Sequence, residues 1–200
     1  MGRRPNPQRK QDLLDEIVDY LGENGIGDLS LRPLAKRLGT STYTLTYQFG
    51  SKDQLLADSV RHAVKLQLAA VSELTEDEAT APELVRRLWV WTTKQSNLRL
   101  VRMLLEATTL AASQPDVFGG VGNEIISGGM TLLTRAMQRA GYDEAEARRH
   151  ATRAWATFVG LQVDLLATGE RKRVTLAVDD LCAALEELTR SAPLVSAQRN

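Results

Sequence analysis

Residues 30–54, with the sequence SLRPLAKRLGTSTYTLTYQFGSKDQ, decide the fold of this chain. An apolar run at helical spacing follows Ser30 and ends at Gly39. Its members are Leu31, Leu34, Ala35 and Leu38. Ser41 can cap a second helix only two residues after that glycine. Two short helices joined so tightly cannot lie antiparallel, so the stretch predicts the steep crossing of a helix-turn-helix motif.

The second helix of this pair presents hydroxyls and phenols. Leu45 and Phe49 are four residues apart and therefore share the buried face. The side chains left wholly or partly outward are Thr42, Tyr43, Thr44, Thr46, Tyr47 and Gln48. Such groups suit hydrogen bonds with base edges and phosphate oxygens, and threonine methyls suit thymine methyls.

The same stretch is basic and ends at a third helix start. Between Leu29 and Lys52 there is no acid, and the basic residues are Arg32, Lys36, Arg37 and Lys52. This predicts a polyanionic partner. After Gly50, Ser51 to Gln54 fits the S-x-x-Q capping box, which places Lys52 in the first turn of a helix. A lysine at an exposed helix N-terminus makes a phosphate clamp, and the alternative is a merely solvated lysine.

These residues resemble the N-terminal domain of the TetR family of transcriptional regulators. The resemblance rests on Leu34-Ala35, Leu38-Gly39, Leu45, Phe49 and Ser51-Lys52-Asp53-Gln54-Leu55. It implies a DNA-binding domain in residues 1–51 and a helical effector-binding and dimerisation domain in residues 52–200. The family usually has a small residue at Tyr43 and commonly an aromatic one at Thr46, and we interpret Tyr47 as the substitute for that phosphate-contacting aromatic. The candidate DNA-binding residues are Arg32, Thr42, Tyr43, Thr44, Thr46, Tyr47 and Lys52.

The formal net charge is zero, but two segments near the N-terminus, residues 1–10 and 29–52, carry basic side chains without any acid. Residues 1–10 form a basic N-terminal arm without acids that contains Arg3, Arg4, Arg9 and Lys10. This arm is either a solvated tail or a segment that neutralises phosphates or enters the minor groove. The first helix, expected from Gln8 to Asn24, has an acidic face that phosphates would repel, so we expect that face to point away from DNA.

The rest of the chain reads as helices, without strand alternation. A long helix is expected from Lys52 to about Glu73, followed by a loop from Thr75 to Pro82. Further helices are expected at residues 83–94, 98–113, 121–140, 143–167 and 175–190. The predicted fold is all-α, with an N-terminal three-helix helix-turn-helix domain and a larger C-terminal bundle for ligand binding and dimerisation.

The last two expected helices carry more apolar surface than one small bundle can cover. From Ala154 to Ala167 the clearly polar side chains are Thr157, Gln162 and Asp164. Pairing with symmetry mates in a four-helix bundle would bury the excess, so we expect a homodimer, as the resemblance also implies. A two-fold dimer reads a palindromic operator with its reading helices about one DNA turn, roughly 34 Å, or a multiple apart.

Apolar and aromatic residues of the middle helices are candidates for lining an effector pocket, and ordinary core packing is the alternative for each. The candidates are Trp89, Met103, Phe118, Met130, Trp155, Phe158 and Gln162. The expected effector is a small apolar or amphipathic molecule.

The remaining expectations concern individual polar side chains and the single cysteine. Arg102 and Glu106, spaced i and i+4, are expected to form a surface pair, and His62 is expected at a helix surface without a role. Asp164 should be either exposed at a dimer edge or bonded to a specific partner. Cys182, the single cysteine, is expected to be a small buried hydrophobe.

Enzyme chemistry is not expected. The sequence offers no nucleophile with a base, metal cluster or phosphate loop at usable spacing, so we expect no catalytic site, cofactor or metal. No window approaches roughly eighteen uncharged apolar residues, and no secretory core follows Met1. A cytoplasmic protein with no membrane partner is therefore expected.

Together these features predict a sequence-specific DNA-binding transcriptional regulator. We expect a repressor that a small-molecule effector releases from its palindromic operator by tilting the helix at residues 52–73. The alternatives are a non-specific, architectural DNA-binding protein and a helical protein-interaction module without a ligand.

Overall fold

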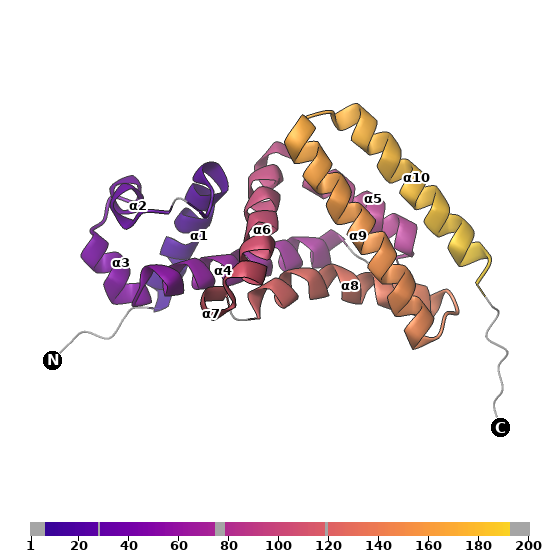
Figure 1. The fold of residues 1–200 in the computed structure, drawn as a ribbon, viewed down its shortest axis with the longest axis horizontal. Coiled ribbons are helices and arrows are strands. Elements are labelled where there is room, and N and C mark those ends of the chain that lie inside the picture. Colours follow the sequence, from indigo (N-terminus) through magenta and orange to yellow (C-terminus); the bar gives the residue numbers. More distant parts are fainter. Residues whose placement is uncertain (1–6, 28, 75–78, 119, 193–200) are drawn as a thin grey trace, which may run out of the picture. The chain divides into compact units, whose positions relative to one another are not determined.

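The computed structural model describes residues 7–27, 29–74, 79–118 and 120–192. Within these ranges every regular element is an α-helix, which confirms the all-α prediction (Figure 1). The helices are α1 (Pro7–Asn24), α2 (Leu31–Arg37), α3 (Thr42–Phe49), α4 (Lys52–Leu74), α5 (Ala81–Thr92), α6 (Gln95–Ser113), α7 (Pro115–Phe118), α8 (Val121–Arg139), α9 (Glu144–Thr168) and α10 (Arg171–Arg190).

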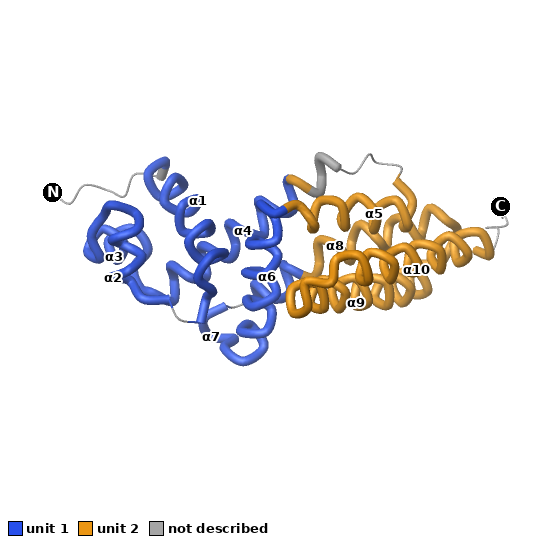
Figure 2. The backbone as a smooth tube through the Cα atoms, turned by 90° about the horizontal axis from the view of Figure 1, so that it is seen from above, with its two compact units in different colours: residues 1–69, 95–125 blue, residues 70–94, 126–200 orange. Residues whose placement is uncertain are grey.

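The chain divides into two compact units (Figure 2). Unit 1 consists of residues 1–69 and 95–125, and unit 2 consists of residues 70–94 and 126–200. Unit 1 therefore adds α6 and α7 to the first three helices and most of α4. The functional division after Ser51 stays a prediction.

Unit 1 is built around the apolar stripe of α1. Leu13, Ile17 and Leu21 of that stripe have no exposed surface. They belong to one buried cluster that includes Leu45 of α3 and Met103 of α6. Three helices of this length bury little surface by themselves, so α4 and α6 supply much of the packing that a stable unit needs.

Unit 2 is a helical bundle in which α10 packs against both α5 and α9. The buried face of α10 consists of Val174, Val178, Cys182 and Leu185. Cys182 is fully buried, as predicted, and its Sγ atom lies 3.7 Å from the carbonyl oxygen of Pro82. Burial raises the pKa of the Cys182 thiol, so the side chain behaves as a small hydrophobe.

One helix start lies inside the stretch expected to be a loop. Residues 75–78 lie outside the described part of the chain, but α5 already begins at Ala81. Glu83 accepts hydrogen bonds from the backbone N–H and the hydroxyl of Thr80, each at 2.8 Å. These bonds lower the pKa of Glu83 and stabilise the first turn of α5.

The starts of two other helices differ from the predicted starts by a few residues. α6 begins at Gln95 rather than Leu98, and α10 begins at Arg171 rather than Thr175. The short helix α7 occupies a segment in which only a break was expected.

Candidate nucleic-acid interface

The turn between α2 and α3 has the expected chemistry. Gly39 takes a positive φ of 58°, a conformation that favours glycine, and so ends α2. Ser41 is the N-cap of α3, because its hydroxyl accepts the N–H of Thr44 at 3.0 Å. The two helices pack against each other across this short turn.

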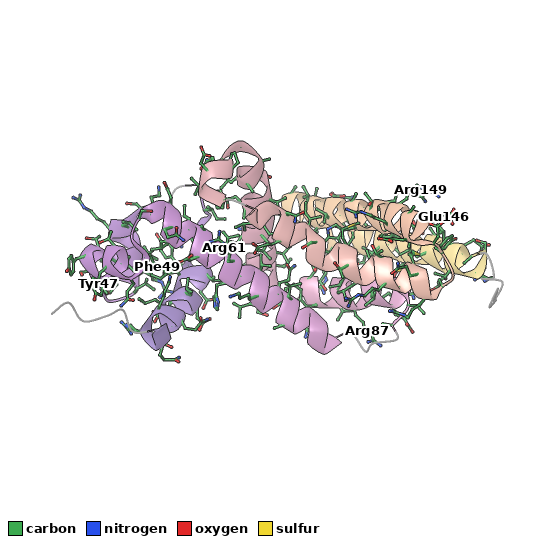
Figure 3. The ribbon with its side chains drawn as sticks, turned by 90° about the horizontal axis from the view of Figure 1, so that it is seen from below. Tyr47, Phe49, Arg61, Arg87, Glu146 and Arg149 are labelled. Carbon is green, nitrogen blue, oxygen red and sulfur yellow. The ribbon has the colours of Figure 1, made fainter. Side chains whose placement is uncertain are left out.

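α3 has one buried and one exposed face. Leu45 and Phe49 are 0% and 3% exposed, as predicted, whereas Tyr43 and Tyr47 are 75% and 43% exposed. The two tyrosine rings stack, with centroids 6.2 Å apart and planes inclined by 23°. Figure 3 marks Tyr47 and Phe49 on this helix. The phenols thus form one continuous polar and aromatic surface.

The threonines of α3 are less available than the sequence implied. The Thr46 hydroxyl donates to the carbonyl oxygens of Thr42 and Tyr43, at 3.1 Å each. The Thr44 hydroxyl lies 2.9 Å from that of Ser41. Gln48, expected to point wholly or partly outward, is half-buried, and its Oε1 atom is buried without a hydrogen-bond partner among the described residues.

The basic residues expected to meet phosphate are exposed. Arg32 in α2 and Lys52 in α4 both lie on the surface. Ser51 caps α4, since its hydroxyl accepts the N–H of Gln54 at 3.1 Å. In a capping box the Gln54 side chain would also bond to the backbone N–H of Ser51. This part of the prediction is wrong, because the Gln54 amide donates to Asp58 at 2.9 Å instead.

The basic N-terminal arm lies only partly in the described residues. Arg3 and Arg4 fall outside them. Lys10 lies in α1, forms an ion pair of 2.7 Å with Asp58 and sits 5.1 Å from the centroid of the Phe49 ring. This lysine therefore links α1 to α4 and α3, and its charge is partly neutralised within unit 1.

Two acidic side chains of α1, Asp15 and Glu23, contact other helices of unit 1. His62 of α4 is only 7% exposed, and its Nε2 lies 2.6 Å from Oδ1 of Asp15. The expectation of a surface histidine was therefore wrong. Glu23 contacts Arg99 of α6 and lies 3.9 Å from Arg37 of α2.

A surface groove of about 360 Å³ lies in unit 1 between α1, α2 and the first turn of α6. Its charged walls are Asp19, Glu23, Arg37 and Arg99. The groove therefore offers charges of both signs, unlike the apolar effector pocket that the sequence predicts.

The seven effector candidates divide between the two units. Met103 and Phe118 are 0% and 1% exposed and belong to the core cluster of unit 1. The other five, Trp89, Met130, Trp155, Phe158 and Gln162, belong to unit 2.

In unit 2 the aromatic candidates form a cluster. Phe158 lies edge-to-face with Trp89 at 6.3 Å and stacks with Trp155 at 5.7 Å between ring centroids. Trp89 donates its indole N–H to Thr175 at 3.0 Å, and buried Gln162 donates to Thr92 at 2.9 Å. The buried indole N–H of Trp155 has no hydrogen-bond partner in the described part of the chain. Met130 is half-buried on α8.

Asp164 is bonded to a specific partner, as one of its two alternatives predicted. Arg173 of α10 binds it through two parallel hydrogen bonds of 2.8 and 2.7 Å. These bonds hold the pKa of Asp164 below its ordinary value. They also tie the end of α9 to the start of α10.

Two further features bear on function. Within the described residues, no group of three or more His, Cys, Asp or Glu side chains is placed to hold a metal ion. No helix in those residues combines the length and apolarity needed to cross a membrane.

Comparison with known proteins relates the helix-turn-helix to a family. Residues 13–58 match the family described as bacterial regulatory proteins, tetR family. The HTH-type transcriptional regulator BetI of Serratia proteamaculans (strain 568) is 32% identical over 74 residues, which are 34% of this chain and 37% of that protein. The alignment thus spans little more than a third of that relative's length.

Two crystal structures share the fold over nearly the whole chain. A transcriptional regulator from Rhodococcus sp. Rha1 has a TM-score of 0.78 at 20% identity, covering 92% of this chain and 99% of its own. The multidrug binding protein EbrR, complexed with imidazole, has a TM-score of 0.66 at 25% identity, covering 98% of this chain and 96% of its own. The family match runs from α1 into α4, so the helix-turn-helix segment of this chain is similar to that of the tetR family of bacterial regulatory proteins.

Proposed function

We propose that this protein is a dimeric transcriptional repressor that binds a palindromic operator and is released by a small-molecule effector. The exposed face of α3 carries the DNA-binding part of this proposal. It offers Tyr43 and Tyr47 to solvent on a helix-turn-helix that lies within the family match. A recognition helix needs such an outward face to reach base edges in the major groove.

The flanking groups suit the phosphate backbone. Arg32 and Lys52 are exposed near either end of the α2–α3 pair, and Lys52 lies in the first turn of α4, where backbone N–H groups point outward. Tyr47 supplies a further phosphate contact, and Tyr43, Thr42, Thr44 and Thr46 lie toward the bases. Phosphate contacts fix the register, and the α3 side chains read the sequence.

Exposed apolar residues on α9 and α10 support dimerisation. Val163 and Leu176 are 51% and 66% exposed on two helices that pack side by side in unit 2. Pairing these helices with their symmetry mates buries this surface in a four-helix arrangement. The resulting two-fold axis relates two copies of α3, as a palindromic site requires.

The aromatic cluster of unit 2 supports an effector site. Trp155 is half-buried and lies against the buried rings of Trp89 and Phe158, so an effector that enters here meets apolar rings, with the indole N–H of Trp155 and the buried Gln162 as polar contacts. EbrR, which shares the fold, is a multidrug binding protein. Because α4 is one continuous helix from Lys52 to Leu74, an effector that shifts it also moves α3. A coupling of about 1–3 kcal/mol would change operator affinity several-fold to a hundredfold.

The experiment that tests DNA binding compares Lys52→Ala with Lys65→Ala. Lys65 is also exposed on α4, about 20 Å farther along the helix at 1.5 Å per residue. Affinity for a random-sequence duplex is measured by fluorescence anisotropy over a range of salt concentrations. We expect Lys52→Ala to weaken binding and to reduce the slope of log K against log salt by about 1, and Lys65→Ala to leave both unchanged.

The outcomes separate the alternatives. If the two substitutions had equal effects, the assignment of a phosphate contact to Lys52 would be wrong. Salt-dependent binding without any preference among sequences would favour an architectural protein. Failure of the wild-type protein to bind DNA at any salt concentration would favour an interaction module.

A further inference from the structure

A carboxylate from α6 closes the turn between α1 and α2. Both carboxylate oxygens of Glu106 accept the backbone N–H of Ile26, at 3.0 Å each. Oε1 of Glu106 also accepts the N–H of Gly27 at 2.8 Å. Ile26 and Gly27 lie between the end of α1 at Asn24 and the start of α2 at Leu31, so this side chain binds the segment that leads into the helix-turn-helix from far away in the sequence. The expected surface pair with Arg102 is thereby replaced by a backbone-binding role.

The turn is shaped to receive this carboxylate. Gly25 has a positive φ of 85°, which turns the chain so that successive N–H groups converge on Glu106. A Cβ atom on Gly25 would lie 3.4 Å from Oε2 of Glu106, and one on Gly27 would lie 3.5 Å from Oε1. These are ordinary van der Waals distances, so the requirement for glycine comes from the positive φ of Gly25 and not from a lack of space beside the carboxylate. Hydrogen bonds to a charged acceptor are stronger than those between neutral groups.

A second contact joins α6 to the same part of unit 1. Arg99 forms an ion pair with Glu23 in the last turn of α1. α6 also packs closely there, because a Cβ atom on Gly22 would lie 3.0 Å from Cβ of Arg99. Arg99 and Glu106 are about two helical turns apart, so they lie on one face of α6. This face therefore holds both the end of α1 and the turn into α2.

We infer that Glu106 is a positioning residue for DNA binding, an inference that rests on the function proposed above. It fixes the turn before α2 and hence the orientation in which α2 and α3 face DNA, without touching DNA itself. Leu34, Leu45 and Phe49 belong to the buried apolar cluster of unit 1, which persists when the carboxylate is removed, so loss of Glu106 leaves the helix-turn-helix folded but less firmly oriented. Specific binding requires a fixed orientation, whereas non-specific attraction to phosphates does not.

The test uses Glu106→Gln and Glu106→Ala, with Glu16→Gln as the matched control. Glu16 is exposed on α1, so its substitution makes the same charge change in the same unit. Affinities of the full chain are measured for its selected consensus duplex and for a random duplex, at a temperature where circular dichroism shows each variant folded. Exchange of the Ile26 and Gly27 amides is followed by NMR on the free protein.

We expect both Glu106 variants to lose specific affinity by about tenfold, the factor that one charge-assisted hydrogen bond carries. Random-duplex affinity should stay within about twofold of the wild type, because the phosphate contacts persist. The Ile26 and Gly27 amides should exchange faster in both variants, and the control should match the wild type in all three measurements.

Three results overturn the inference. Unchanged specific affinity would show that Glu106 does not position the reading helix. Equal losses for both duplexes would show that it only maintains the fold. Wild-type protein that binds neither duplex would remove the proposed function itself, and the inference with it.

Discussion

The indole ring of Trp155 lies directly over Gly129, so that a Cβ atom added to this glycine would lie 2.2 Å from two ring carbons. Gly129 is on α8 and Trp155 is on α9, and the ring also stacks on Phe158. The missing side chain at residue 129 is therefore what lets α8 accommodate the aromatic cluster of unit 2.

Gly129→Ala should destabilise the protein. The added methyl group forces the Trp155 ring away from Phe158, and overpacking of this kind costs about 1–3 kcal/mol. The gain in helix propensity from glycine to alanine, about 1 kcal/mol, offsets only part of that cost. Chemical denaturation measures the free energy of unfolding, with Thr131→Ala, an exposed change two residues farther along α8, as the control. Equal stability of Gly129→Ala and the wild type would contradict the packing described here.

The pair of Asp164 and Arg173 should make stability depend on pH. The pKa of Asp164 is lowered in the folded protein, chiefly by hydrogen bonds from Arg173. A carboxyl group whose folded pKa lies below its unfolded value, about 3.9, stabilises the fold fully above that value. The stabilisation is lost as the pH falls through the folded pKa.

The substitution Asp164→Asn should therefore lower the melting temperature by an amount that depends on pH. We expect the variant to melt at a lower temperature than the wild type near neutral pH, and the difference to vanish as the pH falls toward 2. Thermal melts followed by circular dichroism across this range provide the measurement. A difference that stays constant with pH would mean that the ion pair does not stabilise the joint between α9 and α10.

Removal of the α3 cap should weaken unit 1. Ser41→Ala leaves the N–H of Thr44 without its side-chain acceptor, a loss that costs about 0.5–2 kcal/mol. Ser41→Asn retains a capping oxygen and should restore most of that stability. Urea denaturation of the two variants and the wild type tests this order, and equal destabilisation by both substitutions would refute the capping role.

A negative charge on the exposed apolar surface of α10 should prevent the two protomers of the proposed dimer from associating. Leu176→Glu places a carboxylate in the apolar surface that pairing would bury, so we expect monomers in sedimentation-velocity experiments. Val90→Glu is the control, because Val90 is 62% exposed on α5 and lies outside the proposed interface. Dimers of Leu176→Glu as tight as those of the wild type would place the interface elsewhere.

Local signals explain why the helix-turn-helix could be predicted from the sequence. Leu45 and Phe49 are spaced for one helix face, and Ser41 and Ser51 precede helices whose N–H groups they cap. The start of α5 also has a local signal, because Glu83 follows Thr80 at capping-box spacing, although the sequence prediction placed Pro82 in a loop. Pro is well tolerated in the first turn of a helix, so Pro82 is compatible with the start of α5.

Contacts between distant segments could not be predicted in this way. No local pattern pairs Glu106 with Ile26 and Gly27, and none assigns α6 to unit 1. His62 was misplaced although a signal existed. It follows Leu55 and Ser59 at helical spacing on the buried face of α4, where a histidine needs a partner, and Asp15 provides it.

Selection of bound fragments from random duplex DNA, with the full-length protein at near-physiological salt, tests the central claim most directly. We expect enrichment of a palindromic consensus whose half-sites lie about one DNA turn, or a multiple of it, apart. Enrichment without any motif, or a motif with no two-fold symmetry, would contradict a dimer that reads DNA through two copies of α3.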